Sequence, residues 1–172
     1  GTAFGEIKLI QSDGGPGDRL GESVAISGTA TIVGAPLHQN KSGAAYLFDV
    51  ATGDQIVKLF PDDGSPNDRY GLSVAIRCTT AIVGAAGDCD NGDGSGSAYL
   101  FNSATGDQIG KLLPDDGVMN DLFGVSVAIL GTTAIVGAPY DDDNGNNSGS
   151  VYSFYPLSGE QIVKLLESDG LA

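Results

Sequence analysis

Short apolar runs alternate with Gly- and Asp-rich stretches along the whole chain. The clearest example is residues 123–139, FGVSVAILGTTAIVGAP, where two apolar runs flank a Gly-Thr turn. Nearly the same text occurs at residues 20–36 and 70–86. Runs of this length that are rich in Val, Ile and Thr and end at turn residues predict β-strands. The sequence shows no helical periodicity of useful length, so the pattern predicts an all-β repeat protein.

The repeat is about 50 residues long and contains four apolar runs, which we term strands A to D. In the last complete unit the runs lie at residues 125–130, 132–138, 149–154 and 160–166. Strands C and D are separated by short turns with a glycine, which supplies the positive φ of a tight hairpin. Four antiparallel strands per repeat predict one blade of a β-propeller. A β-solenoid is the main alternative, although its repeats are shorter.

The units are placed at residues 8–57, 58–110 and 111–163, with partial repeats at residues 1–7 and 164–172. Closed propellers have about four to eight blades, whereas this chain has three units and an extra strand D at residues 5–10. An unpaired strand edge is a liability that proteins cover. We therefore expect residues 1–172 to form a single repeat domain that is part of a larger propeller or assembly. A second copy of the chain would give six blades.

Three short sequence motifs carry a family resemblance: Tyr70-Gly71, Phe123-Gly124 and Gly137-Ala138-Pro139. They resemble the FG-GAP repeats of integrin α-chain propellers, and residues 126–154 are closer still to the short FG-GAP variant of secreted bacterial and algal proteins. Leu20 and Ala86 depart from the repeat, since they replace the aromatic residue of FG and the proline of GAP. The resemblance implies a propeller and an extracellular or cell-surface location. It implies no single activity.

The formal net charge of −14 narrows the classes of partner. Nucleic acids and anionic lipids are disfavoured, because phosphate contacts need clustered Lys and Arg. No apolar run is long enough to insert into a membrane. The charge suits a cation, a basic protein partner or simply a solvated acidic surface.

The acids gather in two kinds of connection. Because neighbouring strands run up and down, the D–A and B–C connections share one face, which holds sixteen of the 22 acids. Each close carboxylate pair costs about 1 kcal/mol even in water, so a cation such as Ca²⁺ would stabilise these loops. The candidate Ca²⁺ ligands are Asp88, Asp90, Asp93, Asp141 and Asp143. Ordinary Asp-Asn-Gly turn chemistry is the alternative. The calcium loop of other FG-GAP repeats cannot be carried over, since the FG-to-GAP interval here has no acids.

No group predicts catalysis. The single histidine, His38, lies in a loop of one unit, where we expect it to be solvated. The paired carboxylates are turn residues that lack the burial needed for useful pKa shifts. Tyr46, Tyr99 and Tyr152 recur at one position of strand C and predict packing between blades, with a sugar-stacking platform as the alternative. The sequence therefore predicts a non-catalytic, extracellular module for binding, adhesion or assembly. The alternatives are a glycan-binding, lectin-like propeller and an accessory region of a secreted hydrolase.

Overall fold

The computed structural model describes residues 5–167, and its regular secondary structure is almost entirely β-strand. Three four-stranded antiparallel sheets follow one another along the chain, and we refer to them as blades 1 to 3. Blade 1 consists of β1 (Val24–Ser27), β2 (Ala30–Ala35), β3 (Ala44–Asp49) and β4 (Gln55–Leu59). Blade 2 consists of β5 (Ser73–Arg77), β6 (Thr80–Ala85), β7 (Ser97–Asn102) and β8 (Gln108–Leu112). Blade 3 consists of β9 (Ser126–Leu130), β10 (Thr133–Ala138), β11 (Ser150–Phe154) and β12 (Gln161–Leu166).

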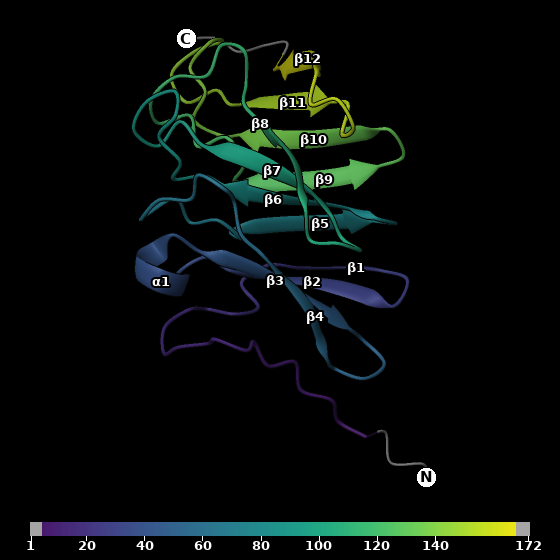
Figure 1. The fold of residues 1–172 in the computed structure, drawn as a ribbon. Helices are drawn as coiled ribbons and strands as arrows, with labels where there is room; N and C mark the ends of the chain where they lie inside the picture. Colours follow the sequence, from purple (N-terminus) through teal and green to yellow (C-terminus); the bar gives the residue numbers. More distant parts are fainter. Residues whose placement is uncertain (1–4, 168–172) are drawn as a thin grey trace.

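Each blade is an up-and-down sheet whose strands are paired in chain order. The innermost strands β1, β5 and β9 pack against one another, so the blades are arranged side by side as in a propeller (Figure 1). The tight turns lie at one end of the sheets, and the long D–A and B–C loops gather at the other, on the left of Figure 1. The all-β prediction and the prediction of propeller blades are both confirmed. Within the described residues the one helix is α1 (His38–Lys41), a single turn in which Gln39 and Asn40 have positive φ.

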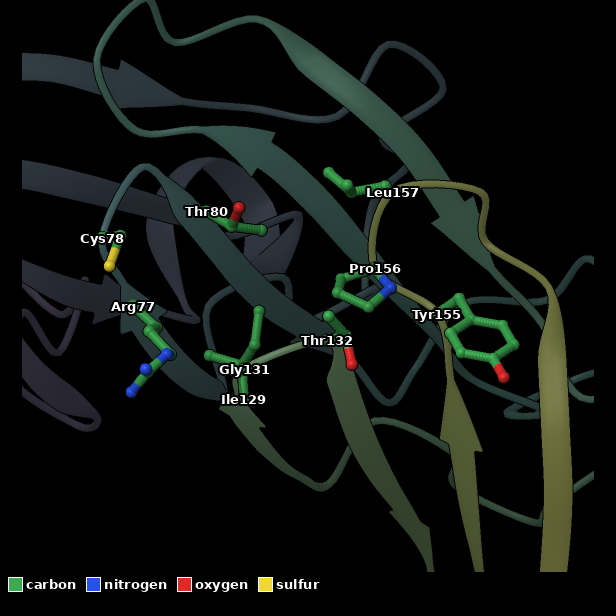
Figure 2. Close-up of a pocket in the computed structure, with 9 residues that line it drawn as sticks. All are labelled: Arg77, Cys78, Thr80, Ile129, Gly131, Thr132, Tyr155, Pro156 and Leu157. Atoms are coloured by element: carbon green, nitrogen blue, oxygen red, sulfur yellow. The ribbon is translucent and has the colours of Figure 1, made fainter.

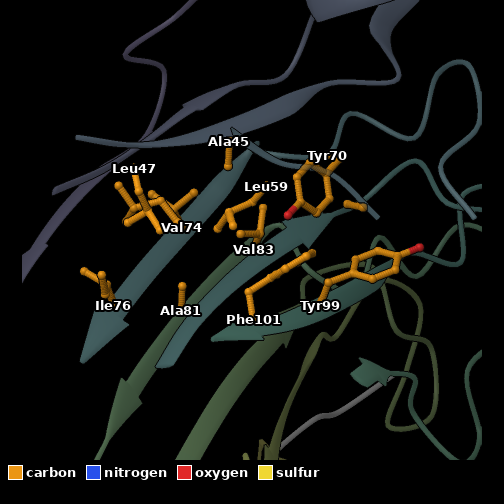
Figure 3. Packing of buried hydrophobic residues seen from close by; sticks show 12 residues of the cluster. Ala45, Leu47, Leu59, Tyr70, Val74, Ile76, Ala81, Val83, Tyr99 and Phe101 are labelled. Atoms are coloured by element: carbon orange, nitrogen blue, oxygen red, sulfur yellow. The ribbon is translucent and has the colours of Figure 1, made fainter. Parts of the chain in front are cut away.

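The hydrophobic core lies between the blades. Leu47 and Leu59 of blade 1 pack against a cluster from blade 2 that includes Tyr70 and Phe101 (Figure 3). The same arrangement recurs between blades 2 and 3, where Leu112 meets Phe123. Burial of apolar area at these contacts is the main stabilising contribution, so each blade depends on its neighbour for stability.

The FG and GAP motifs form one interlocking contact. The carbonyl oxygen of Gly124, the FG glycine of blade 3, accepts a hydrogen bond of 2.7 Å from Ser73 Oγ of blade 2. It lies directly against Gly84, the glycine of the GAP position of blade 2, where a Cβ would overlap it. Ser23, Gly34 and Gly71 repeat this contact between blades 1 and 2. The GAP glycine is therefore required because the FG backbone of the next blade occupies the space of its side chain.

Residues 5–10, the expected extra strand, run where the outer strand of a preceding blade would lie. Ile7 lies against Gly53 as Val57 lies against Gly106. The amide of Ser12 also donates to Gln55 Oε1 at 2.8 Å, as a residue of each later D–A loop donates to the equivalent glutamine. Between residues 5 and 167 no strand lies beside this segment to pair with it, and it is therefore not part of a sheet.

Cys78 and Cys89 are both free and exposed. Between residues 5 and 167 there is no helix with the length and apolar character needed to cross a membrane.

Candidate functional site

A cluster of charged and hydroxyl groups lies at the loops of blade 2, where Tyr99 and Asp88 are buried and Asp63 and Asp90 are exposed. Lys111 Nζ, on β8, lies 2.7 Å from an oxygen of Asp63, 3.0 Å from Asp88 and 2.6 Å from Asp90. The hydroxyl of Tyr99, on β7, lies 2.9 Å from both Asp63 and Asp88. The D–A and B–C loops therefore do meet at one face, and a lysine and a tyrosine join them. We refer to this group as the Lys–Tyr–Asp cluster.

Blade 3 repeats the cluster. Lys164 Nζ lies 2.8 Å from Asp116 and 2.9 Å from Asp141, and it also contacts Asp143. The hydroxyl of Tyr152 lies 2.9 Å from Asp116 and 2.6 Å from Asp141. Because two blades build the same set of contacts, the cluster is a property of the repeat.

The strand register places the lysine and the tyrosine together. Tyr99 and Lys111 are directly opposite each other on β7 and β8, so both side chains point to the same face of the sheet. The Lys111 ammonium lies 5.0 Å from the centre of the Tyr99 ring, within range of a cation–π interaction. The tyrosine ring belongs to the buried cluster that also contains Leu47 and Leu59 of blade 1, which confirms the prediction of packing between blades.

His38 takes the place of an aspartate in blade 1. It occupies the position of Asp88 and Asp141, and its side chain is only 3% exposed, so the expectation of a solvated histidine is wrong. Its Nδ1 lies 2.8 Å from Asp18, and its Nε2 lies 2.9 Å from Lys58 Nζ. Since an ammonium group can only donate, Nε2 accepts from Lys58 and Nδ1 carries the proton toward Asp18. The histidine is buried because the repeat provides a buried position here that needs an acceptor for the lysine.

Burial and hydrogen bonds shift the pKa values of Asp63, Lys111 and Tyr99 in this cluster. Burial alone would raise the pKa of Asp63, but the hydrogen bonds from Lys111 and Tyr99 outweigh it, and the pKa is lowered. Burial would also lower the pKa of Lys111, but the hydrogen bonds to its three aspartates outweigh it, and the pKa is raised. The pKa of Tyr99 is raised by burial and by the charges of Asp88 and Asp63. Lys111 and Asp63 are therefore both charged around neutral pH.

The candidate Ca²⁺ ligands lie in these clusters, with one exception. Asp88 and Asp90 come together with Asp63, which the sequence analysis did not include, and one oxygen of each lies within 4.8 Å of the others. Asp93 lies apart, where it is paired with Cys89 Sγ at 3.6 Å. Lys111 Nζ contacts all three grouped carboxylates, so an ammonium already stands where a metal ion would be placed.

The same is true of Asp141 and Asp143, which share Lys164. A Ca²⁺ ion takes six to eight oxygen ligands and would have to displace the lysine to obtain them. These residues fit an ammonium group better than a metal ion. The sequence analysis missed the lysines, although their recurrence at one position of strand D was a signal that could have revealed them.

A second pair of aspartates closes the D–A loops. Asp68 accepts a hydrogen bond of 2.6 Å from the amide of Ser65, and Asp121 accepts one of 2.8 Å from the amide of Val118. Burial raises the pKa of both carboxyl groups above the ordinary value of 3.8, and the nearby charges of Asp88 and Asp141 contribute to the rise. These two aspartates therefore hold the turns of the D–A loops.

The opposite end of the blades contains an apolar cavity of about 400 Å³ (Figure 2). It lies between the β5–β6 turn, with Arg77 and Cys78, and the turn of blade 3 that carries Tyr155 and Leu157. Arg77 is the one charged residue of its lining, which includes no carboxylate and no histidine. A single cysteine and a single tyrosine beside an arginine do not make a set of metal ligands.

The sheets and their loops define the chain as a repeat protein built from β-propeller blades. It belongs to the FG-GAP repeat family, which matches residues 5–48, 54–101 and 107–154. Each match begins at the outer-strand position of one blade and ends in the third strand of the next, so each includes one D–A connection.

Two solved structures of computationally designed proteins share the fold. Ika4 is 15% identical with a TM-score of 0.60, and the match covers 94% of this chain and 80% of Ika4. Ika8 is 14% identical with a TM-score of 0.57, and the match covers 85% of this chain but only 36% of Ika8. At such low identity the likeness shows the fold alone. No curated protein matches the chain.

Proposed function

We propose that this chain is a non-catalytic FG-GAP propeller module that acts outside the cell by binding, and that its acidic loop face is the surface it presents. The observation that carries the proposal is the repeated Lys–Tyr–Asp cluster, which fixes the D–A and B–C loops to each other. Around this fixed base, exposed carboxylates such as Asp62, Asp115 and Asp142 point outward from the same loops. A rigid surface with many negative charges suits a basic partner.

The electrostatics of the cluster support the absence of catalysis. A general acid or base needs a pKa near the working pH. Here the pKa values of Asp63 and Asp116 are shifted down, and those of Lys111 and Lys164 are shifted up, away from neutrality. Each ammonium offsets part of the charge of its three carboxylates, which is typical of a structural ion-pair network. The extracellular setting is supported by membership of the FG-GAP family, whose repeats are typical of extracellular proteins.

Binding of a lysine-rich peptide at several salt concentrations tests the proposal. The variant Asp62→Asn/Asp115→Asn removes two exposed charges from the loop face without touching a cluster. The control Asp54→Asn/Asp107→Asn removes the same charge from the hairpins at the opposite end. We expect the first variant to bind more weakly and with a smaller salt dependence, and the control to bind like the unmodified chain. Equal losses of affinity in both variants would show that binding depends only on the net charge of the chain, and would contradict binding at the acidic loop face.

Calcium and glycan binding are the other candidate functions. The grouping of Asp63, Asp88 and Asp90 favours a cation, whereas Lys111 competes with it. Thermal unfolding with Ca²⁺ or EDTA decides the question, since a ligand at 100 times its dissociation constant adds about 2.7 kcal/mol. For glycans, Tyr99 and its equivalents are fully buried and do not offer their ring faces to a sugar. A glycan array would test recognition by the remaining Asp and Asn side chains.

A further inference from the structure

Blade 3 exposes a face whose counterparts in the other blades are covered. Leu165, on β12, is 54% exposed, whereas the equivalent Leu59 and Leu112 are fully buried under the following blade. Ile135, on β10, is 42% exposed, whereas the equivalent isoleucine of blade 2, Ile82, is fully buried. The repeat therefore encodes a contact surface on blade 3 that no part of the described chain fills.

This surface contains a preformed recess at Gly137, which we refer to as the socket. In blades 1 and 2 the GAP glycine receives the FG carbonyl of the next blade, but a Cβ on Gly137 would meet only the Ser126 side chain of its own blade. A groove of about 570 Å³ lies at this place and is lined by Ser126, Gly137, Gly149 and Leu165 among others. Gly149 keeps a positive φ of 77°, close to the 83° of Gly96, which pairs with Phe123 of the next blade.

Blade 1 carries the matching segment, Leu20-Gly21 with Val24 and Ile26 of β1, which we refer to as the plug. Gly21, at its FG position, has a φ of 95°, near the 88° of Gly71, and its amide donates to the Gly34 carbonyl at 2.9 Å. The buried Gly71 makes the same bond within blade 2, yet nothing lies within 4 Å of a Cβ placed on Gly21. Val24, on β1, is 65% exposed, whereas the equivalent Val74 is 8% exposed. Plug and socket thus hold their docked backbone conformations, which lowers the entropic cost of association.

From these observations we infer that the exposed face of blade 3 is a docking surface for blade 1 of a second copy of this chain. Leu20-Gly21 of one copy occupies the groove at Gly137 of the other, and Val24 covers the blade 3 strands as Val74 covers blade 1. Two copies joined head to tail at both junctions form a ring of six blades. Three copies would give nine, beyond the range of about four to eight blades in closed propellers.

The closed ring requires one rearrangement. Residues 5–9 of the incoming copy lie where the outer strand of the preceding blade belongs, and β12 already fills that place in blade 3. Because β12 is paired with β11 from Ser150 to Phe154, whereas residues 5–9 are unpaired, β12 keeps the position and residues 5–9 move aside.

Sedimentation or light scattering at rising protein concentration tests this inference, which is independent of the acidic loop face. We expect the unmodified chain to form a dimer. The variant Gly137→Ala places one methyl group in the socket and should remain monomeric. The control Gly110→Ala changes a strand position with open space around it and should still dimerise. A monomer at every concentration, or a Gly137→Ala variant that dimerises normally, would overturn the inference.

A mixing experiment tests the head-to-tail arrangement. The variant Val24→Glu/Ile26→Glu charges the plug at two positions that are exposed in the single chain, and circular dichroism of the diluted protein checks its fold. Alone, this variant and Gly137→Ala should each be monomeric, because every junction contains one defective side. Mixed, they should form a heterodimer through the one junction that has an intact plug and an intact socket. Dimerisation of either variant alone, or no heterodimer in the mixture, would rule the arrangement out.

Discussion

Lys111 Nζ lies 3.0 Å from Oδ2 of Asp88, a carboxylate whose side chain is almost completely buried. Substitution Lys111→Met keeps the aliphatic stem but leaves three carboxylates facing one another without a cation. Because Asp63 and Asp90 are partly solvated, we expect a loss of about 2–3 kcal/mol, less than for a fully buried pair. Chemical unfolding measures the change. Lys8, the equivalent lysine of the N-terminal segment, is exposed, and Lys8→Met should change stability by less than about 0.5 kcal/mol.

The same substitution should create a dependence on calcium. In Lys111→Met the oxygens of Asp63, Asp88 and Asp90 lie within reach of one ion, and no ammonium competes for them. We expect the melting midpoint of the variant to rise with Ca²⁺ and fall with EDTA, whereas that of the unmodified chain stays constant. A rise of the same size in both proteins would show that calcium binds without displacing the lysine.

Two buried tyrosines should respond to loss of the hydroxyl in opposite directions. The hydroxyl of Tyr70 has no hydrogen-bond partner, and blade 3 has Phe123 at the same position. We expect Tyr70→Phe to stabilise the chain by about 1 kcal/mol, because an unsatisfied buried group is removed. The hydroxyl of Tyr99 is shared by two carboxylates, and Tyr99→Phe should cost about 1.5–3 kcal/mol. Urea unfolding of both variants compares them directly, and a loss of stability in Tyr70→Phe would contradict the argument.

The interlock predicts unequal effects of one substitution at two equivalent glycines. A methyl group at Gly84 overlaps the Gly124 carbonyl and forces blades 2 and 3 apart, so Gly84→Ala should cost about 2–3 kcal/mol. At Gly137 the same methyl group meets only a flexible serine side chain, and the stability of the monomer should change by less than about 0.5 kcal/mol. Unfolding at low protein concentration measures both values without a contribution from association. Equal losses of stability in the two variants would mean that the strand itself requires glycine at this position, whether or not a neighbouring blade is present.

Stability should pass through a maximum at acidic pH, near the ordinary carboxyl pKa of 3.8. The pKa values of Asp68 and Asp121 are raised, chiefly by burial, so these groups bind protons more tightly in the folded state, and stability increases as pH falls through their folded pKa values. Other carboxyl groups have pKa values below the ordinary 3.8, because hydrogen bonds to Lys, Tyr or His outweigh burial, and their contribution is lost at lower pH. These groups are Asp13, Asp18, Asp63, Asp116 and Asp141.

Urea unfolding from neutral to strongly acidic pH measures this profile. The variant Asp68→Asn/Asp121→Asn retains an acceptor oxygen for each turn amide but does not titrate. It should lose the rise in stability and keep the fall at lower pH. A profile that declines steadily from neutrality in the unmodified chain would contradict the opposing effects of the two sets of aspartates.

The bounds of the strands could be predicted closely because the sequence of each strand recurs in three units. The expected run at residues 132–138 became β10 (Thr133–Ala138), and the shared face of the D–A and B–C loops was also foreseen. The Lys–Tyr–Asp cluster was not predicted, because Asp63, Asp88 and Lys111 are far apart in sequence and only the blade geometry brings them together. The lysines lie on strands, so a comparison of the charges in the loops did not include them. The burial of His38 was not predicted for a related reason, since the histidine occupies the position of Asp88 in the repeat although it lies in a loop.

Removal of residues 1–10 should strengthen self-association. In the single chain, Ile7 and Leu9 cover part of blade 1 near Gly53, the place that β12 of a docked copy would fill. Association therefore has to displace this segment first, and its deletion removes that cost while it leaves Asp13, the partner of Tyr46 and Lys58, in place. We expect a lower dissociation constant by sedimentation. As a control, the deletion combined with Gly137→Ala should remain monomeric, since the socket is still blocked. A weaker dimer after the deletion would instead mean that residues 5–9 pair with β11 of the other copy and that β12 is the strand that gives way.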